Sequence, residues 1–465
     1  MTGEGIDYTL DIFRDSNGNS RILAIWDQED QSGIAPEGFL YGSEYLREQI
    51  NEALQSDNPY EIVPSRDELR HGTTMAGVAA GSSIDGGRTY VGAAPESDIV
   101  IVKLKQCKKY LRDFYLLPDD VPAYSENDVM LGVKYATSFL IPFERPVIIC
   151  LGLGTNQGNH SGTSALAAYL SEVAALRSCA VVVGGGNEGN SAHHFAGKLR
   201  TGSNDLNNYE DVEIRVGSGV RGFVTEMWGN ITDIFYISIR SPGGETVQPM
   251  RIRSGRSGGT YRFIFEETVI TIDSVLAEQD TGEELIVIRF EAPTEGIWNI
   301  RVLAQGEVYN GEYNMWLPIR QFITGEVYFL QSNPYITMTE PAFSRNVISV
   351  STYNDFNNSF YQESGRGFAR NGSIKPDMSA PGVNVSTIYG AGTGSSIASA
   401  IAAGAVAQFM QWAVVEGNRI LVEGVETKSY FIRGAARDGD VAYPNREWGY
   451  GRLDIAGTFE TISMI

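Results

Sequence analysis

Cysteine is scarce in this chain of 465 residues. Only Cys107, Cys150 and Cys179 occur, and no pair of them forms a CxxC motif. An odd number of widely spaced cysteines supports neither a disulfide framework nor a zinc site. We therefore expect a reducing compartment and no bound metal or other cofactor. Cys150 lies in an apolar run, so we expect a small, buried side chain there.

Basic residues and long apolar runs are also in short supply. The chain has 36 Lys and Arg against 57 Asp and Glu, a formal net charge of −21. A field of that sign repels nucleic acids and anionic membranes, so neither is expected as a partner. The opening stretch "MTGEGIDYTL" has no basic segment followed by an apolar one, and about 18 consecutive apolar residues occur nowhere. We expect no signal peptide, no membrane span and a cytoplasmic location.

The first 200 residues alternate short apolar runs with segments of helical spacing. The runs are rich in β-branched residues, as is typical of strands buried on both faces. They are "RILAIWD" (21–27), "DIVIVKL" (98–104), "VIICLGLG" (147–154) and "AVVVGGGN" (180–187), and the helical segments are 43–55, 127–140 and 163–178. This alternation predicts βαβ units and an α/β fold with a mainly parallel sheet.

Residues 201–335 have a different pattern. Segments such as "DVEIRVGSG", "DIFYISIRSPGG" and "EELIVIRFEAPTEG" alternate polar and apolar residues between Gly, Pro and Asn turns. Short period-two strands of this kind predict an antiparallel β-sandwich. The earlier pattern returns with "NVISVST" (346–352). We therefore expect an α/β unit formed by residues 1–200 and 336–465, interrupted by an all-β domain.

Three short motifs carry residues suited to catalysis. His71 begins the small-residue segment "HGTTMAGVAAG", where a helix start would leave the imidazole accessible. Asn187 follows a strand that ends in glycines and could donate to a developing oxyanion. "GTGSSIASAIAAG" (392–404) places serines at a helix start, where backbone N–H groups favour an anion. Taken one by one, the motifs are also compatible with a structural histidine, a strand cap and a capped core helix, respectively.

Together the motifs resemble the subtilase family of serine proteases. "HGTTMAG" is similar to its histidine motif, "GGGNEG" to its oxyanion motif, and "WGYGRLD" (448–454) to its closing segment. The resemblance implies a three-layer subtilisin-like fold and roles for His71 as base and Asn187 as oxyanion donor. It also implies that Leu153 and Gly154, in "CLGLGTNQG", form a wall of the substrate cleft by pairing with an extended peptide. Gly152 stands where many relatives carry serine.

The resemblance also selects the nucleophile. In the family a glycine lies eight residues beyond the catalytic serine, and counting back from Gly404 gives Ser396. In the alternative register Gly394 would replace the serine, but the helix would then need two extra residues. Ala400 stands where most members carry proline.

The acid of the triad is the difficult residue. Asp27 ends an apolar run, as a triad acid should, whereas the resemblance places the acid at Gly3 or Met1, just before "GIDYTLDIF". In the family register no aspartate is present, so the acid would lie upstream of this sequence or be lost. Without it, we expect turnover to fall by roughly 10⁴.

Within the family, the insertion and "RILAIWDQ" resemble the clostridial Csp group of spore-germination subtilases. That resemblance implies a jelly-roll domain at 201–335, a spore-associated location, and a pro-segment if one is encoded upstream. The expected function is a serine endopeptidase that acts on protein or peptide substrates through Ser396, with a spore cortex-lytic precursor as the implied substrate. The alternative is a catalytically impaired pseudoprotease that acts in signalling or as a scaffold.

Overall fold

The computed structural model describes residues 2–83, 90–143, 145–203, 205, 207–248 and 256–463. A nine-stranded sheet with the order β19-β18-β6-β5-β1-β4-β2-β3 runs through the larger unit, and β20 pairs with β18. The pairs at its centre are parallel, whereas β3 and β19 are antiparallel to their neighbours. The strands are β1 (Thr2–Gly3), β2 (Ile22–Asp27), β3 (Ser43–Leu46), β4 (Ile99–Lys103), β5 (Val147–Leu151), β6 (Cys179–Gly184), β18 (Ile348–Asn354), β19 (Ser359–Phe360) and β20 (Met378–Pro381).

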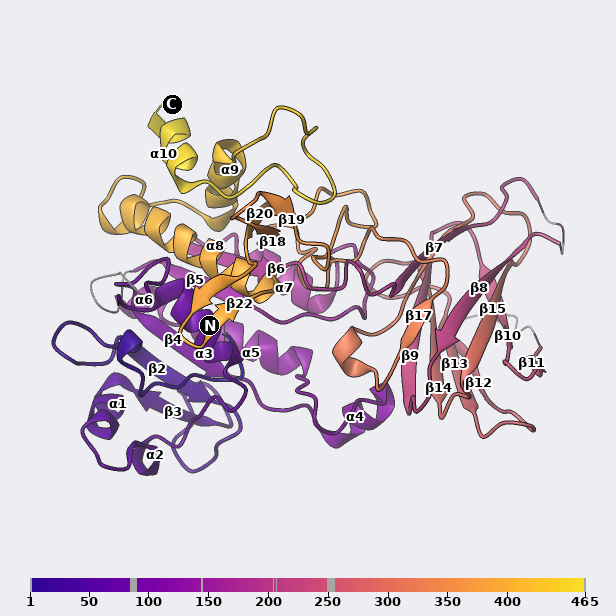
Figure 1. Cartoon of the computed structure of the whole chain (residues 1–465), viewed down its shortest axis with the longest axis horizontal. Coiled ribbons are helices and arrows are strands. Elements are labelled where there is room, and N and C mark those ends of the chain that lie inside the picture. The colour runs from indigo at the N-terminus through magenta and orange to yellow at the C-terminus, as the bar shows by residue number, and fades with distance from the viewer. Residues whose placement is uncertain are drawn as a thin grey trace.

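Helices cover both faces of this sheet (Figure 1). Alternate residues of β6 point to opposite faces: Val181 packs with the cluster that includes α5 and α7, and Val182 with the cluster that includes α3 and α8. The sheet is buried on both faces, so its strands can be almost entirely apolar. The helices are α1 (Arg47–Leu54), α2 (Pro59–Ile62), α3 (His71–Ala80), α4 (Lys109–Tyr115), α5 (Glu126–Thr137), α6 (Leu140–Phe143), α7 (Ala165–Val173), α8 (Ser395–Met410), α9 (Gly424–Gly434) and α10 (Ile455–Ser463).

Helix α8 crosses the larger unit as its central helix. Together with the π-helical turn η4 (Gln411–Val415) it forms a 21-residue apolar segment, long enough to span a membrane by length and composition alone. Ala398, Ala402 and Phe409 are among its fully buried side chains. Its apolar character is therefore explained by packing inside the fold. Small side chains along α8 also allow close approach to α3, where Ala79 and Ala403 belong to one cluster.

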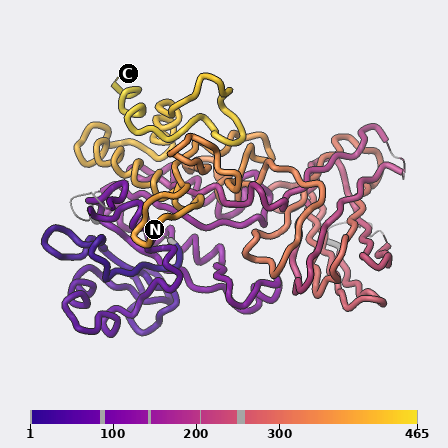
Figure 2. The backbone as a smooth tube through the Cα atoms, in the orientation of Figure 1, coloured from indigo at the N-terminus to yellow at the C-terminus, as the bar shows by residue number. Residues whose placement is uncertain are grey.

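A second unit is inserted between β6 and β18 and lies to the right in Figure 1, and the backbone trace shows the same two parts (Figure 2). It has two antiparallel sheets, of the orders β11-β10-β15-β8-β17 and β12-β13-β14-β9-β16-β7. Its strands are β7 (His194–Lys198), β8 (Tyr209–Val216), β9 (Gly222–Gly229), β10 (Phe235–Arg240), β11 (Thr246–Val247), β12 (Arg256–Arg262), β13 (Val269–Val275), β14 (Glu284–Glu291), β15 (Gly296–Ala304), β16 (Glu312–Trp316) and β17 (Val327–Phe329). Inward side chains of both sheets form one core.

The predicted α/β class with a mainly parallel sheet is confirmed, and the inserted residues form paired antiparallel sheets. Strand β7 precedes residue 201 and pairs with β16, and its Phe195 side chain belongs to the core of the sandwich. The jelly-roll connectivity and the domain limits at 200 and 335 stay predictions.

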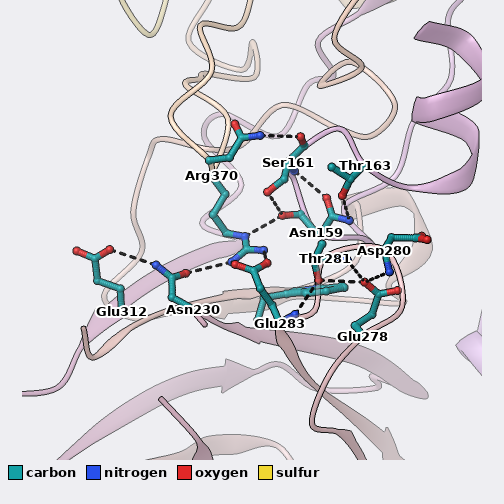
Figure 3. Close-up of polar contacts among 12 residues, drawn as sticks. Asn159, Ser161, Thr163, Asn230, Glu278, Asp280, Thr281, Glu283, Glu312 and Arg370 are labelled. Atoms are coloured by element: carbon teal, nitrogen blue, oxygen red, sulfur yellow. Dashed lines mark hydrogen bonds and ion pairs between the residues drawn. The ribbon is translucent and has the colours of Figure 1, made fainter. Parts of the chain in front are cut away.

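The two units are joined by a buried ion pair. Arg370, which precedes β20, pairs with Glu283, the residue before β14, and donates to the Asn159 carbonyl at 2.8 Å (Figure 3). Its side chain is only 4% exposed, so the charge depends on these partners. The contact holds the turn before β14 against the loop after β5.

Candidate active site

A large cavity of about 1390 Å³ lies where several parallel strands end. Glu4 follows β1, Gly152 follows β5, and Asn187 follows β6, and all three residues line this cavity. The carboxyl ends of parallel strands meet at one edge of a sheet, which is where α/β folds bind ligands. His71 and Ser396, at the N-termini of α3 and α8, complete the same wall.

His71 begins α3, and its position is fixed by contacts in the first turn. The Asp67 carboxylate accepts hydrogen bonds from the Thr73 backbone N–H at 2.7 Å and the Thr73 hydroxyl at 2.6 Å, which caps the helix. A side chain at Gly72 would lie 2.1 Å from the Gly5 carbonyl oxygen. Glycine at this position therefore lets α3 approach the chain that follows β1.

Glu4 supplies a carboxylate to His71. The distance between Glu4 Oε2 and His71 Nδ1 is 2.6 Å, and the two side chains are 16% and 39% exposed. Burial by itself lowers the pKa of His71, but the hydrogen bond and charge of Glu4, with the charge of Asp67, outweigh it and raise the pKa. The sequence prediction considered only aspartate and so overlooked Glu4. The available signal was its place directly before "GID", which resembles the segment after the family's acid.

Asp27 has other partners in the structure. Its Oδ1 accepts the backbone N–H groups of Glu29 and Asp30, and its Oδ2 lies 3.4 Å from Lys103 Nζ. The alternative that Asp27 serves as the acid is therefore not supported. Its carboxylate caps the turn that ends β2.

The start of α8 distinguishes between the candidate serines. Gly394 precedes the helix with φ of 147°, in a region that favours glycine. The Ser395 side chain is buried, beside Gly184, whereas Ser396 is partly exposed at the cavity. The Ser396 hydroxyl donates to the Gly152 carbonyl at 3.1 Å. The geometry thus favours Ser396 as the accessible serine.

Asn187 is oriented by the helix start. The Ser395 backbone N–H donates to Asn187 Oδ1 at 2.9 Å, and this contact fixes which way the amide faces. Since Oδ1 is engaged by the helix, Nδ2 is left as the donor toward an added ligand. The Ser396 N–H lies in the first turn, where the helix provides no acceptor. The two N–H groups can serve together as donors to an oxyanion.

Leu153 and Gly154 line the cavity directly after Gly152, and their pairing with a peptide stays a prediction. A Cβ at Gly154 would lie 2.3 Å from the Thr339 hydroxyl, so glycine is required for this close packing. A Cβ at Gly152 would lie 2.2 Å from Met75 Sδ. The Met75 side chain therefore occupies the space that a serine at position 152 would need.

The remaining histidines are packed away from solvent. His193 and His194 are 5% and 1% exposed, so both side chains are buried. His193 pairs with Glu188, and His194 stacks on Trp316 in the sandwich. His160 also stacks on Trp316, and burial lowers the pKa of His160 to about 3 and of His194 to about 4. Cys150 is buried, as predicted.

Comparison with known proteins shows the family of this chain. Residues 330–451 match the model of the subtilase family. The chain is also 30% identical to the CspB protease of Clostridium perfringens, with a TM-score of 0.86 over 99% of this chain and 92% of that one. The chain belongs to the subtilase family. Among subtilases it resembles the Csp type, and the family assigns it to the subtilisin-like serine endopeptidases.

Two further solved structures have a lower identity to this subtilase. The PatG macrocyclase in complex with peptide is 11% identical, with a TM-score of 0.45 over 99% of this chain and 90% of that chain. The prenylagaramide maturation protease PagA is 12% identical, with a TM-score of 0.41 over 84% and 82% of the two chains. Neither likeness is strong enough to carry an argument. No curated protein sequence matches the chain significantly.

Proposed function

We propose that this subtilase hydrolyses peptide bonds through an acyl-enzyme on Ser396. The observation that carries the proposal is the contact of 2.6 Å between Glu4 and His71, on the same cavity as Ser396 and Asn187. Glu4 is therefore our candidate for the acid of the triad, for which the family motifs indicated no residue of this chain. The site thus has a nucleophile, a base, an orienting acid and an oxyanion donor.

The first chemical step follows from these positions. Rotation about χ1 turns the Ser396 hydroxyl from the Gly152 carbonyl toward His71, whose Nε2 takes the proton as Oγ attacks the scissile carbonyl. Glu4 holds Nδ1 protonated and stabilises the imidazolium that forms. The negative charge on the carbonyl oxygen is accepted by Asn187 Nδ2–H and the Ser396 backbone N–H.

The second half of the reaction uses the same groups. The imidazolium gives its proton to the leaving amine, which departs and leaves Ser396 acylated. A water molecule then gives a proton to His71 and attacks the ester. The C–Oγ bond breaks, His71 returns the proton to Ser396 Oγ, and the carboxylic acid product leaves. The substrate backbone would pair with Leu153 and Gly154 at the cavity wall.

The likeness to CspB supports a more specific substrate, which we propose for this chain as well: an inactive protein precursor cleaved during spore germination. One observation favours the alternative of an impaired enzyme, namely that the Ser396 hydroxyl bonds to Gly152. The two functions differ in whether Ser396 reacts as a nucleophile.

A fluorophosphonate probe tests this reactivity, because an activated serine displaces its fluoride and becomes phosphonylated. We expect labelling of the wild-type protein and of Ser395→Ala, and none of Ser396→Ala. Ser395 is the matched control, since it lies at the same helix start with its side chain buried. Absence of labelling in a folded wild-type protein would establish the impaired alternative, and labelling lost in Ser395→Ala alone would refute the assigned nucleophile.

A further inference from the structure

The active-site cavity continues from the catalytic residues to the inserted sandwich. Glu226 of β9 and the turn residues Glu278 and Asp280 line it together with Ser396. The chain after β5 connects the two ends: the Gly152 carbonyl contacts Ser396, and the Gly158 N–H donates to Glu226 Oε2 at 2.9 Å. Six residues span at most about 20 Å when extended. A peptide that pairs with this segment would therefore reach the sandwich several residues from its scissile bond.

Glu226 is a buried carboxylate with one oxygen unused. The residue is 7% exposed, and its Oε2 accepts both the Gly158 N–H and the Trp228 indole N–H at 3.1 Å. Within the described ranges, no hydrogen bond reaches Oε1. Burial raises the pKa of Glu226, and the charge of Glu278 raises it further. A cation placed at Oε1 would stabilise the charged carboxylate, and so it would oppose the rise in pKa that burial and Glu278 cause.

The surroundings of Glu226 are acidic. Glu126, at the start of α5, lines the same cavity, and the pKa of Tyr115 is raised by burial and then by the charges of Glu226 and Glu126. Figure 3 shows Glu278 and Asp280 on the turn that faces the loop around Asn159.

No cation of the cavity wall balances this charge. Among the wall residues that the structure describes, the only basic side chains besides His71 are Arg70 and Arg320. Arg70 lies over the Tyr389 ring, and Arg320 pairs with Glu363 at 2.9 Å. Next to Glu226 the described cavity wall therefore carries acidic side chains and no basic side chain that is free of a partner.

We propose that this end of the cavity is a subsite for a lysine or arginine side chain of the substrate. The proposal rests on the proposed protease function and adds the inserted domain to the substrate-binding surface. A metal ion is a poorer occupant, because no three acidic, His or Cys side chains in the described part of the chain are placed to hold one. A flexible, cationic side chain can reach Oε1 while the substrate backbone stays at Leu153 and Gly154.

Quenched fluorescent peptides measure the preference directly. In a set of otherwise identical peptides, a single lysine replaces glutamine at each position on both sides of the scissile bond. We expect one position several residues away to raise kcat/KM by about tenfold at low salt, an effect that weakens as salt screens it. In Glu226→Gln this ratio of lysine to glutamine peptide should fall toward one. In Glu307→Gln, an exposed sandwich carboxylate outside the cavity, it should stay at the wild-type value.

Asp280→Asn provides a second test on an exposed turn, where a folding defect is not expected, and it should lower the same ratio. Equal kcat/KM for all peptides, or a lysine preference that persists in both variants, would overturn the subsite. Fluorophosphonate labelling separates this outcome from failure of the protease function. If the enzyme is labelled but shows no preference for lysine, only the subsite is refuted. If the enzyme is not labelled, the proposed protease function is refuted.

Discussion

Replacing Glu4 by glutamine removes the charge beside His71 while keeping the size of the side chain. The contact it alters joins Oε2 to Nδ1 at 2.6 Å, and the side chains of Glu4 and His71 are 16% and 39% exposed, so solvent screens the pair in part. The carboxylate accepts the Nδ1 proton and stabilises the imidazolium, whereas an amide can donate to Nδ1 and select the wrong tautomer. Loss of a triad carboxylate costs about 10⁴ in turnover, or roughly 5.5 kcal/mol of barrier.

The pH profile gives a second readout of the same contact. The pKa of His71 is raised chiefly by Glu4, against the opposing effect of burial, and only neutral His71 can take the serine proton. Activity should therefore rise as the pH passes upward through this pKa. In Glu4→Gln the pKa falls, so the acidic limb should move to lower pH while the plateau of kcat drops.

The assay is steady-state hydrolysis of one quenched peptide between pH 5 and 9. Glu68→Gln is the matched control, because it removes an exposed carboxylate three residues before His71. Glu4→Asp should recover part of the lost kcat, since it restores the charge at a shorter reach. If Glu4→Gln keeps kcat within about threefold of the wild type, the proposed role of Glu4 is wrong; the expected loss is about 10⁴.

Two further predictions concern the same wall of the cavity. Asn187→Ala should lower kcat by about 10² to 10³ with a smaller change in KM, because the amide donates to the oxyanion mainly in the transition state; an equal loss through KM alone would contradict this role. Gly152→Ser should cost about 1–3 kcal/mol in denaturant unfolding, because the new Cβ meets Met75 Sδ. Adding Met75→Ala should relieve the clash, so the two substitutions should be less destabilising together than their sum; strict additivity would refute the steric account.

Candidates for much of the site could be predicted because each of these residues lies in a short contiguous motif. The small residues after His71 and after Ser396 form the helices α3 and α8, and the glycines before Asn187 end β6. Each of these side chains owes its place to its own strand end or helix start. Local sequence carries that information directly.

Contacts between distant elements could not be predicted in the same way. Glu4 reaches His71 because β1 lies between β4 and β5 and because α3 packs close to the chain that follows β1. The place of Glu4 before "GID" is a signal for an acid, but the sequence alone does not show that this side chain reaches His71. The space at Gly152 is likewise filled by Met75, from a helix that ends long before β5 begins.

The sequence by itself determined the α/β class, the insertion of β-strands, and the residues His71, Asn187 and Ser396 as candidates. The spacing of apolar residues and the residue types at helix starts are local properties, so they can be recognised from the sequence alone. Only the tertiary structure decided that Glu4 lies at His71, that the Asn187 amide is turned by Ser395, and that Glu226 of the sandwich shares the cavity. Those facts depend on which strands and loops pack side by side, and that is fixed by the folded core.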